Sequence, residues 1–345
     1  MKRVRVVVCD DSLFMRAALK RVLQGDARIE VVGEARDGAE AIARVAELRP
    51  DVVTMDFNMP VLDGASAVRA IMRQRPTPVV MISAHTTDGA RETIEALAAG
   101  AVDFLAKPSG EVSADFARLA PALVAKVLGA AEATMPPPSV PEPEPRAPTP
   151  SPRFVASSPG APTRVVVIGV STGGPGALAL FLPALPRDAP FGLLIVQHMP
   201  GGFTQALAER LDAICAVCVR EARAGDRPQP GLALIAPGDH HLEVAPDGTL
   251  AITDGPEVNG VRPSVDVTMR TAAGAWGRRV TGVVMTGMGR DGAEGLLAIK
   301  RGGGATLAQD RDSCVVFGMP RVAIELGAAD RVVPLDGLAG ALLHR

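Results

Sequence analysis

One stretch decides the fold of the second half of this chain: Val165-Val166-Val167-Ile168-Gly169-Val170-Ser171-Thr172-Gly173-Gly174-Pro175-Gly176. It opens with a β-branched run that is typical of a buried strand and too short to span a membrane. Glycines then surround a Ser-Thr pair, and an Ala/Leu pattern from Ala177 to Leu182 predicts a helix. A hydroxyl on such a strand-to-helix turn lies beside helix N-terminal N–H groups, so Ser171 is a candidate nucleophile. The same glycines could instead form a dinucleotide-binding turn.

The length and composition of the chain limit what it can be. A chain of 345 residues exceeds one typical domain, so two are expected. The formal net charge is -2, without long runs of either sign, which argues against a nucleic-acid or membrane-surface binder. Aromatic residues make up 3% and Tyr is absent, so base-stacking platforms are not expected either.

The cysteines and the N-terminus indicate a cellular compartment. Four cysteines are few for this length and suit a reducing environment. Cys215 and Cys218 form an isolated C-x-x-C, which we interpret as buried strand thiols rather than as a zinc or redox site. The apolar run that follows the basic N-terminus stops at Asp10, too early for a signal peptide, and no segment approaches the roughly 18 apolar residues of a membrane span. We therefore expect a soluble cytoplasmic protein.

Residues 1–130 alternate short β-branched runs with longer helical patterns. The pattern predicts strands at Val4–Cys9, Ile29–Glu34, Val52–Met55, Val79–Ile82 and Val102–Leu105, and helices near Phe14–Leu23, Gly38–Leu48, Gly64–Arg73, Asp88–Ala99 and Ser113–Leu128. Five βα units predict an open, doubly wound parallel sheet, with ligands at the carboxyl ends of its strands.

Polar residues follow four of these strands. Asp10 and Asp11 follow the first, Asp56 the third, Ser83 the fourth and Lys107 the fifth. Three converging carboxylates repel one another unless a cation is bound, and such oxygen ligands suit Mg²⁺. A lysine and a hydroxyl opposite them can bind a phosphoryl group, so one aspartate is expected to accept phosphate as an acyl phosphate.

This spacing resembles the receiver domain of two-component response regulators, which has a flavodoxin-like fold. The family's motifs match Asp10-Asp11, Asp56-Phe57-Asn58-Met59-Pro60-Val61-Leu62-Asp63-Gly64, Ser83 and Lys107-Pro108, and its aromatic switch position is Phe104. The resemblance implies phosphorylation of Asp56 and a switch formed by Ser83, Phe104 and Lys107. It also implies Mg²⁺ held at the acidic pair by Asp11, Asp56 and the backbone carbonyl of Asn58.

A proline-rich segment separates the two halves. Nine of the seventeen residues from Pro136 to Pro152 are proline, which predicts an extended, semi-rigid spacer. We expect a receiver domain at 1–130, a linker at 131–162 and a second domain at 163–345.

A second α/β pattern begins at Arg164. After the strand that precedes Ser171, it predicts strands at Leu193–Val196, Leu232–Ala236, Leu242–Val244, Leu250–Ile252, Val280–Met285 and Thr306–Gln309, and helices that end near Leu211 and span Ala293–Lys300. We expect a Rossmann-like α/β domain.

Two functions compete for the Ser171 turn. A dinucleotide site wants an acidic residue at the end of the next strand, whereas that strand ends in Gln197-His198. A serine hydrolase needs a histidine base and a carboxylate that fixes its tautomer. His198 and Asp291 each follow a predicted strand as Ser171 does, so the three would meet at one sheet edge. The rival base is His240-His241, in a polar turn.

The second half resembles the chemotaxis protein-glutamate methylesterases. The matching motifs are Gly169-Val170-Ser171-Thr172-Gly173-Gly174, Gln197-His198-Met199-Pro200, Thr286-Gly287-Met288-Gly289-Arg290-Asp291-Gly292, Ala308-Gln309-Asp310 and Ser313-Cys314-Val315-Val316-Phe317-Gly318-Met319-Pro320. The resemblance implies that Ser171 is the nucleophile, His198 the base, Asp291 the orienting acid and the N–H of Met288 an oxyanion donor, with no cofactor for the ester reaction.

The implied activity is hydrolysis of glutamate γ-methyl esters on chemoreceptors, often with deamidation of receptor glutamines. The implied partners are a chemotaxis-type histidine kinase as phosphodonor and the methylated chemoreceptor as substrate, with no nucleic acid and no membrane insertion. Two alternatives stay open. One is the same esterase acting on a protein ester outside chemotaxis. The other is a non-enzymatic regulator, although the basic recognition helix that DNA binding needs is not legible in the second half.

Overall fold

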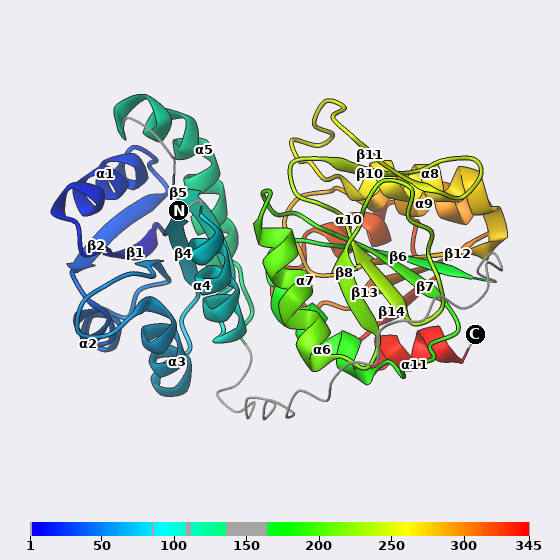
Figure 1. The fold of residues 1–345 in the computed structure, drawn as a ribbon. Helices are drawn as coiled ribbons and strands as arrows, with labels where there is room; N and C mark the ends of the chain where they lie inside the picture. Colours follow the sequence, from blue (N-terminus) through cyan, green and yellow to red (C-terminus); the bar gives the residue numbers. More distant parts are fainter. Residues whose placement is uncertain (1, 85, 108–111, 136–163, 345) are drawn as a thin grey trace. The chain divides into compact units, whose positions relative to one another are not determined.

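The computed structural model describes residues 2–84, 86–107, 112–135 and 164–344. The chain divides into two compact units, residues 1–141 and 142–345 (Figure 1). The division falls in the proline-rich segment. Residues 136–162 of the predicted linker lie outside the described residues, as does Pro108 of the Lys-Pro pair.

The first unit is a parallel sheet with helices on both faces (Figure 1). Its described strands are β1 (Val4–Cys9), β2 (Ile29–Ala35), β3 (Val52–Asp56), β4 (Val79–Ala84) and β5 (Asp103–Lys107), and its helices are α1 (Leu13–Gln24), α2 (Gly38–Leu48), α3 (Gly64–Gln74), α4 (Thr87–Ala98) and α5 (Val112–Ala131). The strand order is β2-β1-β3-β4-β5. All ten elements match the predicted segments, with ends shifted by at most a few residues.

Burial and capping explain why these segments fold as they do. Val6, Val7 and Val8 of β1 are fully buried, as expected for a strand covered on both faces. Asp37 and Asp63 precede α2 and α3, and each accepts a hydrogen bond from the N3 backbone N–H. The chain winds in opposite directions from β1, so a crevice opens between the carboxyl ends of β1 and β3.

The second unit contains a larger parallel sheet. Its described strands are β6 (Val165–Val170), β7 (Gly192–Gln197), β8 (Cys218–Glu221), β9 (Leu232–Ile235), β10 (His241–Val244), β11 (Leu250–Thr253), β12 (Val280–Val284), β13 (Ala305–Gln309) and β14 (Arg331–Val333), and its α-helices are α6 (Gly174–Phe181), α7 (Phe203–Ile214), α8 (Val265–Trp276), α9 (Ala293–Arg301), α10 (Met319–Glu325) and α11 (Leu338–Leu343). Seven strands pair in the order β14-β13-β12-β6-β7-β9-β8. The other two, β10 and β11, form a separate antiparallel hairpin.

Strand β6 is the centre of this unit. All its residues are buried, and it pairs with β7 on one side and β12 on the other. A Cβ on Gly169 would lie 2.2 Å from Val265, so this glycine lets the start of α8 pack directly against β6. The direction of winding reverses between β6 and β12, which places the ligand crevice of an open α/β sheet at the carboxyl end of β6.

The sequence prediction was incomplete in this unit. It missed α8, β8, β14, α10 and α11. The interpretation of Cys215 and Cys218 as buried strand thiols was wrong for Cys215, which ends α7, and neither thiol is fully buried, although Cys218 does begin β8.

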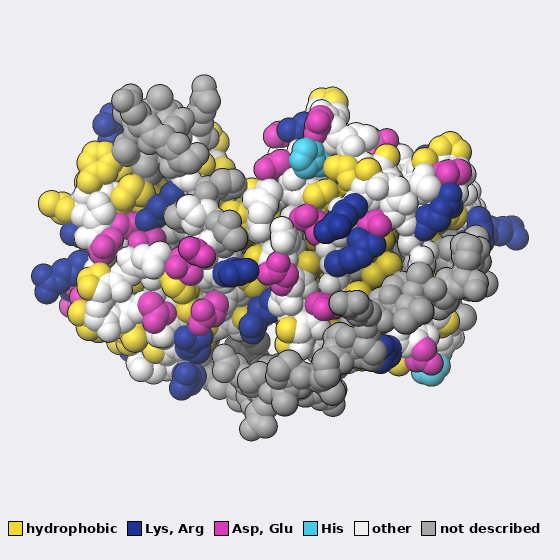
Figure 2. Space-filling view, viewed as in Figure 1, with side chains coloured by type: hydrophobic (Ala, Val, Ile, Leu, Met, Phe, Trp, Pro, Cys, Tyr) yellow, Lys and Arg dark blue, Asp and Glu magenta, His cyan; other side chains and the backbone are white. Residues whose placement is uncertain are grey.

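The surface agrees with the balanced composition. On the face drawn in Figure 2, Lys and Arg side chains are interspersed with Asp and Glu on both units. In the described part of the chain, no helix combines the length and apolarity needed to cross a membrane.

The loop after β3 holds one strained residue. Val61 has φ of 68°, in the left-handed region where β-branched residues are strained, and a hydrogen bond from Leu62 N to Pro60 O closes a tight turn around it. Its side chain is 84% exposed, so removing it loses little packing. We expect Val61→Gly to raise the free energy of unfolding of the first unit by about 1 kcal/mol, since relief of strain exceeds the extra chain entropy of glycine.

Calorimetry of the full chain measures this effect. The single tryptophan, Trp276, lies in the second unit, so its fluorescence does not report on unfolding of the first. Val61→Ala is the matched control, because it retains the Cβ that the turn disfavours and should stay near the wild type. A loss of stability in the glycine variant, or an equal gain in the alanine variant, would contradict the assignment of strain.

Candidate active site

The backbone of Ser171 is fixed where β6 ends. Its N–H donates to Thr286 O at 3.0 Å, and its carbonyl accepts from Gly174 N at 2.8 Å. The same carbonyl accepts a hydrogen bond from Gln197 Nε2 at 3.0 Å, and that amide also donates to His198 O at 3.3 Å. The buried Gln197 at the end of β7 therefore ties the turn that carries Ser171 to the loop that carries His198.

Two positions after Ser171 require glycine because a larger side chain would clash with its neighbours. Gly173 has φ of 76°, and a Cβ there would lie 2.5 Å from Val315. A Cβ on Gly174 would lie 2.1 Å from Oε1 of Gln197. The glycines thus make room for neighbouring side chains at the start of α6, and the site needs no bound phosphate to explain them.

His198 and Asp291 form a hydrogen-bonded pair beside this turn. His198 Nε2 lies 2.8 Å from Asp291 Oδ2, and the two side chains are only 10% and 3% exposed. The anionic carboxylate accepts the Nε2 proton, so Nδ1 is left as the basic nitrogen of the ring. The predicted meeting of three strand ends therefore brings His198 and Asp291 into contact. Ser171 Oγ itself donates no hydrogen bond to any described residue in this conformation.

The carboxylate of Asp291 is saturated with donors. It accepts hydrogen bonds from His198 Nε2 at 2.8 Å, Val265 N at 2.6 Å, Asp266 N at 3.3 Å, Ser264 Oγ at 2.7 Å and Asn259 Nδ2 at 2.9 Å. Burial opposes ionisation of Asp291, but the interactions with His198, then those with Ser264 and Asn259, outweigh it and lower its pKa. Asp291 is held as an anion at the positive N-terminus of α8.

A second carboxylate, Asp266, completes a reciprocal arrangement. Asp266 lies in the first turn of α8 and accepts hydrogen bonds from Gly292 N and Gly295 N, at the start of α9. Asn259 Nδ2 bridges Asp266 and Asp291 at 2.9 Å from each. Burial, with a contribution from the charge of Asp291, raises the pKa of Asp266. Asp291 therefore caps α8, which contains Asp266, and Asp266 caps α9, which follows Asp291, so the position of Asp291 is fixed.

The loop after β12 supplies a candidate oxyanion site. A Cβ on Gly287 would lie 2.7 Å from the Cβ of Ser171, so the loop passes directly over the serine. Thr286 anchors it by donating from Oγ1 to Thr172 O and accepting from Val316 N. The N–H of Met288 donates to no group among the described residues and stays available for a ligand oxygen.

The rival histidines differ from His198 in their surroundings. His241 is buried, and both ring nitrogens are engaged: Nδ1 accepts from Ser264 N and Nε2 lies 3.0 Å from Pro256 O. His240 also pairs with a carboxylate, through Nδ1 with Asp254, but these side chains are 45% and 79% exposed and lack the burial of the His198–Asp291 pair. His241 instead accepts a hydrogen bond from the backbone of Ser264, whose hydroxyl in turn donates to Asp291.

The predicted acid cluster of the first unit is present. Oxygens of Asp10, Asp11 and Asp56 lie within 4.8 Å of one another. Lys107 Nζ contacts Asp56 Oδ1 at 2.7 Å and Asp10 Oδ2 at 3.0 Å. Burial raises the pKa of Asp56 to about 6, against the opposing effect of Lys107 and with a further contribution from Asp10.

Residues 166–342 match the family described as CheB methylesterase, and residues 6–114 match the response regulator receiver domain. The chain belongs to the CheB methylesterase family. It carries the receiver domain ahead of the methylesterase domain, as the resemblance implied.

Relatives align over almost the whole chain. A protein-glutamate methylesterase/protein-glutamine glutaminase of Symbiobacterium thermophilum is 50% identical, over 98% of this chain and 96% of its own. A protein of the same name from Pyrococcus horikoshii is 46% identical, over 97% of this chain and 91% of its own. The crystal structure of the Thermotoga maritima CheB methylesterase catalytic domain is 43% identical, covers 52% of this chain and 97% of its own, and superposes with a TM-score of 0.51.

The donor set of the receiver acid cluster fits a magnesium ion. The three carboxylates offer the hard oxygen ligands that Mg²⁺ prefers, and Lys107 pairs with two of them, Asp10 and Asp56. The side-chain Nδ2 of Asn58 donates to Glu92 Oε2 at 3.0 Å, and the backbone carbonyl of Asn58 remains the metal ligand that the resemblance implies. Two further residues were predicted to form the switch. Ser83 donates to Gly89 O at 3.0 Å, and Phe104 is buried.

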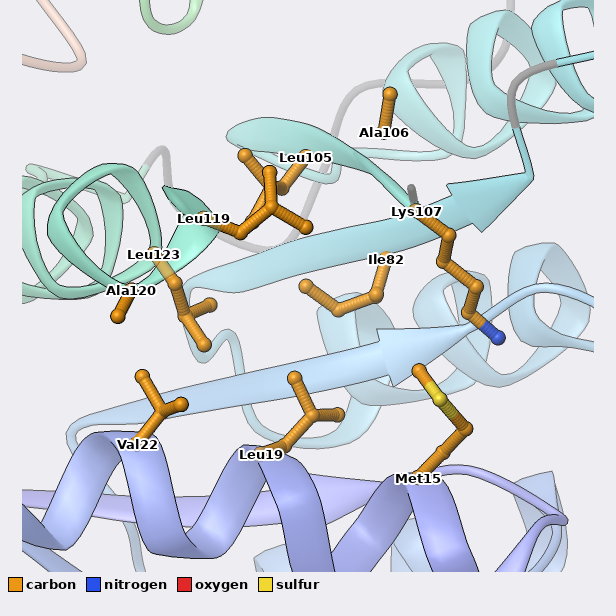
Figure 3. A pocket seen from close by; sticks show the side chains of 10 residues that line it. All are labelled: Met15, Leu19, Val22, Ile82, Leu105, Ala106, Lys107, Leu119, Ala120 and Leu123. Atoms are coloured by element: carbon orange, nitrogen blue, oxygen red, sulfur yellow. The ribbon is translucent and has the colours of Figure 1, made fainter. Parts of the chain in front are cut away.

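The stem of Lys107 borders a small apolar hollow, shown in Figure 3. The other lining residues are Met15, Leu19 and Val22 of α1, Ile82, Leu105 and Ala106 of the sheet, and Leu119, Ala120 and Leu123 of α5. Because these walls are apolar, the hollow accommodates the methylene groups of Lys107 and leaves its amine to the acid cluster.

The sequence prediction missed the residues that hold the methylesterase site together. Asn259, Ser264 and Asp266 were not singled out, because α8 itself was not predicted. The sequence did contain a signal for this helix. Ser264 is a capping residue type, an acidic residue follows in the first turn, and apolar residues recur at helical spacing from Val265 to Trp276. Gln197 and Gln309 were noted as strand ends and motif residues but were given no role, although Gln309 Oε1 accepts the N–H of Thr286 at 2.8 Å.

Proposed function

We propose that this family member hydrolyses glutamate γ-methyl esters on chemoreceptors, with Ser171 as nucleophile, His198 as base and Asp291 as orienting acid. The observation that carries the proposal is the buried His198–Asp291 pair beside the Ser171 turn. Its orientation leaves Nδ1 of His198 as the basic nitrogen for the serine proton.

The chemistry follows from this arrangement. Ser171 Oγ attacks the ester carbonyl carbon while Nδ1 of His198 takes its proton. The N–H of Met288 stabilises the oxyanion. Nδ1 then protonates the departing methanol, and water, activated by the same nitrogen, cleaves the acyl-enzyme to a glutamate carboxylate. Catalytic hydrogen bonds often tighten only when substrate binds, which accounts for the unbound Ser171 hydroxyl.

Deamidation needs the same groups. A glutamine amide replaces the ester, ammonia replaces methanol as the leaving group, and the acyl-enzyme is identical. We therefore propose protein-glutamine deamidation as a second reaction of this site, in agreement with the names of the relatives.

The receiver domain supplies the proposed regulation. A chemotaxis-type histidine kinase phosphorylates Asp56, and Asp11, Asp56 and the Asn58 carbonyl would hold Mg²⁺, which would supply positive charge for the phosphoryl oxygens. The new phosphoryl group draws the Ser83 hydroxyl away from Gly89 O, and Phe104 moves with β5. This shift favours the conformation in which Ser171 can be reached. We place all of this in the cytoplasm, with no nucleic acid as partner.

Methanol release from methylated receptor, measured with and without a small phosphodonor, tests the function and the regulation together. We expect the full chain to release methanol, and to release it faster with phosphodonor and Mg²⁺. Asp56→Ala should keep the basal rate and lose the whole stimulation, because no acceptor carboxylate remains. Unchanged stimulation in that variant would contradict phosphorylation of Asp56. Hydrolysis of another protein's methyl esters, with none on receptors, would favour the alternative substrate.

A further inference from the structure

Two arginines border the loop that passes over Ser171. Arg290 directly precedes Asp291, and its side chain is 63% exposed. Its ion pair with Glu294, at 3.9 Å, is at the outer limit for such a contact, so the guanidinium is largely free to bind another anion.

Arg311 is linked to the same loop through Phe317. Its guanidinium stacks on the ring of Phe317, 4.7 Å from the centroid. Phe317 forms a parallel bridge with Gly287, so the stack holds this charge beside the oxyanion loop. Arg311 forms no ion pair with any described residue. Stacking restricts the side chain and leaves its N–H edge for a carboxylate.

The surface between the two charges is open. Met288 is 42% exposed, and Gly289 has φ of 87° with nothing within 4 Å of the position of a Cβ. Beside this loop the exposed Asp312 follows Arg311, and Glu294 is 41% exposed, so charges of both signs are present. Near His198 and Asn259, Asp239 accepts the N–H of Gly201, and Asp254 and Glu257 are exposed. Arg262 donates to the backbone carbonyl of Asp254 in that region, so it is also of mixed charge.

We infer that Arg290 and Arg311 bind carboxylates that flank the ester on the substrate, so that the preferred substrate is an acidic segment. The inference rests on the proposed esterase function and adds its substrate class. A carboxylate next to the ester gains a charge-assisted hydrogen bond from either guanidinium. Hydrolysis of one ester creates a new carboxylate, so each product would make its neighbours better substrates.

The test uses the full chain and two methylated receptor fragments. One fragment has glutamates beside the methyl ester, and in the other these neighbours are alanine, since glutamine could itself be deamidated. At low ionic strength the wild type should show kcat/KM on the order of tenfold or more higher for the acidic fragment, mainly through KM, and the preference should shrink with added salt. The double variant R290E/R311E should lose or reverse the preference, with a much smaller change on a small neutral glutamate methyl ester.

Arg331→Glu is the matched control, because Arg331 is an exposed arginine of the same unit, on the edge strand β14. It should behave as the wild type on both fragments. Equal kcat/KM values of the wild type for the two fragments, or a preference that survives in R290E/R311E, would overturn the inference. If the wild type releases methanol from neither fragment nor the small ester, the proposed esterase function itself fails.

Discussion

Replacing Ser171 by Ala should lower methanol release from methylated receptor by a factor on the order of 10⁴ or more. The variant keeps the backbone contacts of the turn, because the hydrogen bonds of residue 171 to Thr286, Gly174 and Gln197 all involve main-chain atoms. The only loss is the hydroxyl oxygen that is proposed to form the acyl-enzyme. Binding of receptor and thermal stability should therefore stay close to the wild type.

These two controls separate chemistry from folding. A Ser171→Ala protein with normal stability, normal receptor binding and near-normal methanol release would show that another group carries the reaction. His198→Ala should produce a loss of similar size, and the double variant should be no worse than either single variant, because the two residues act as one unit.

Asp291→Asn should lower turnover by about 10³ to 10⁴, although it changes a single atom of the side chain. Both carboxylate oxygens of Asp291 accept hydrogen bonds from donors, whereas an asparagine side chain has only one accepting oxygen. We expect its oxygen to face Ser264, Asn259 and Asp266, where three donors meet. Its NH₂ group then faces His198 Nε2, which must accept, and the ring proton moves to Nδ1, the nitrogen that should be the base.

Asp266→Asn is the matched control for Asp291→Asn. Asp266 is the other member of the reciprocal helix-capping pair, but no hydrogen bond joins it to His198 among the described residues. Both variants should lose stability, while Asp266→Asn should lose activity by roughly tenfold at most. Thermal melts and kcat of the two variants decide the matter. Equal losses of kcat would mean that Asp291 acts only by supporting the fold.

The sequence predicts the receiver domain almost completely, for physical reasons. Its strands are short and largely apolar, helices α1 to α4 have Ser, Asp or Thr caps, and its site residues lie at or directly after strand ends. Position along the strand therefore determines position in space, and Asp10, Asp56 and Lys107 meet as expected.

The methylesterase domain is less legible, because much of its site depends on contacts between distant segments. His198 and Asp291 follow strands and could be placed, whereas Asn259 lies in a loop with φ of 56° before an unpredicted helix. The bridge from Asn259 to two carboxylates depends on the packing of α8 against α9. Likewise, β10 and β11 have ordinary strand patterns, and no feature of those patterns shows that they leave the parallel sheet.

Labelling with a fluorophosphonate, followed by peptide mapping, tests the central claim most directly, because the reagent forms an O–P bond only with an activated hydroxyl and releases fluoride. The structure predicts one phosphonate per chain, on Ser171 in the peptide that follows β6, and labelling that is strongly slowed in His198→Ala. Modification of a different residue, or equal labelling rates in the wild type and His198→Ala, would contradict the assignment of Ser171 and His198 as nucleophile and base.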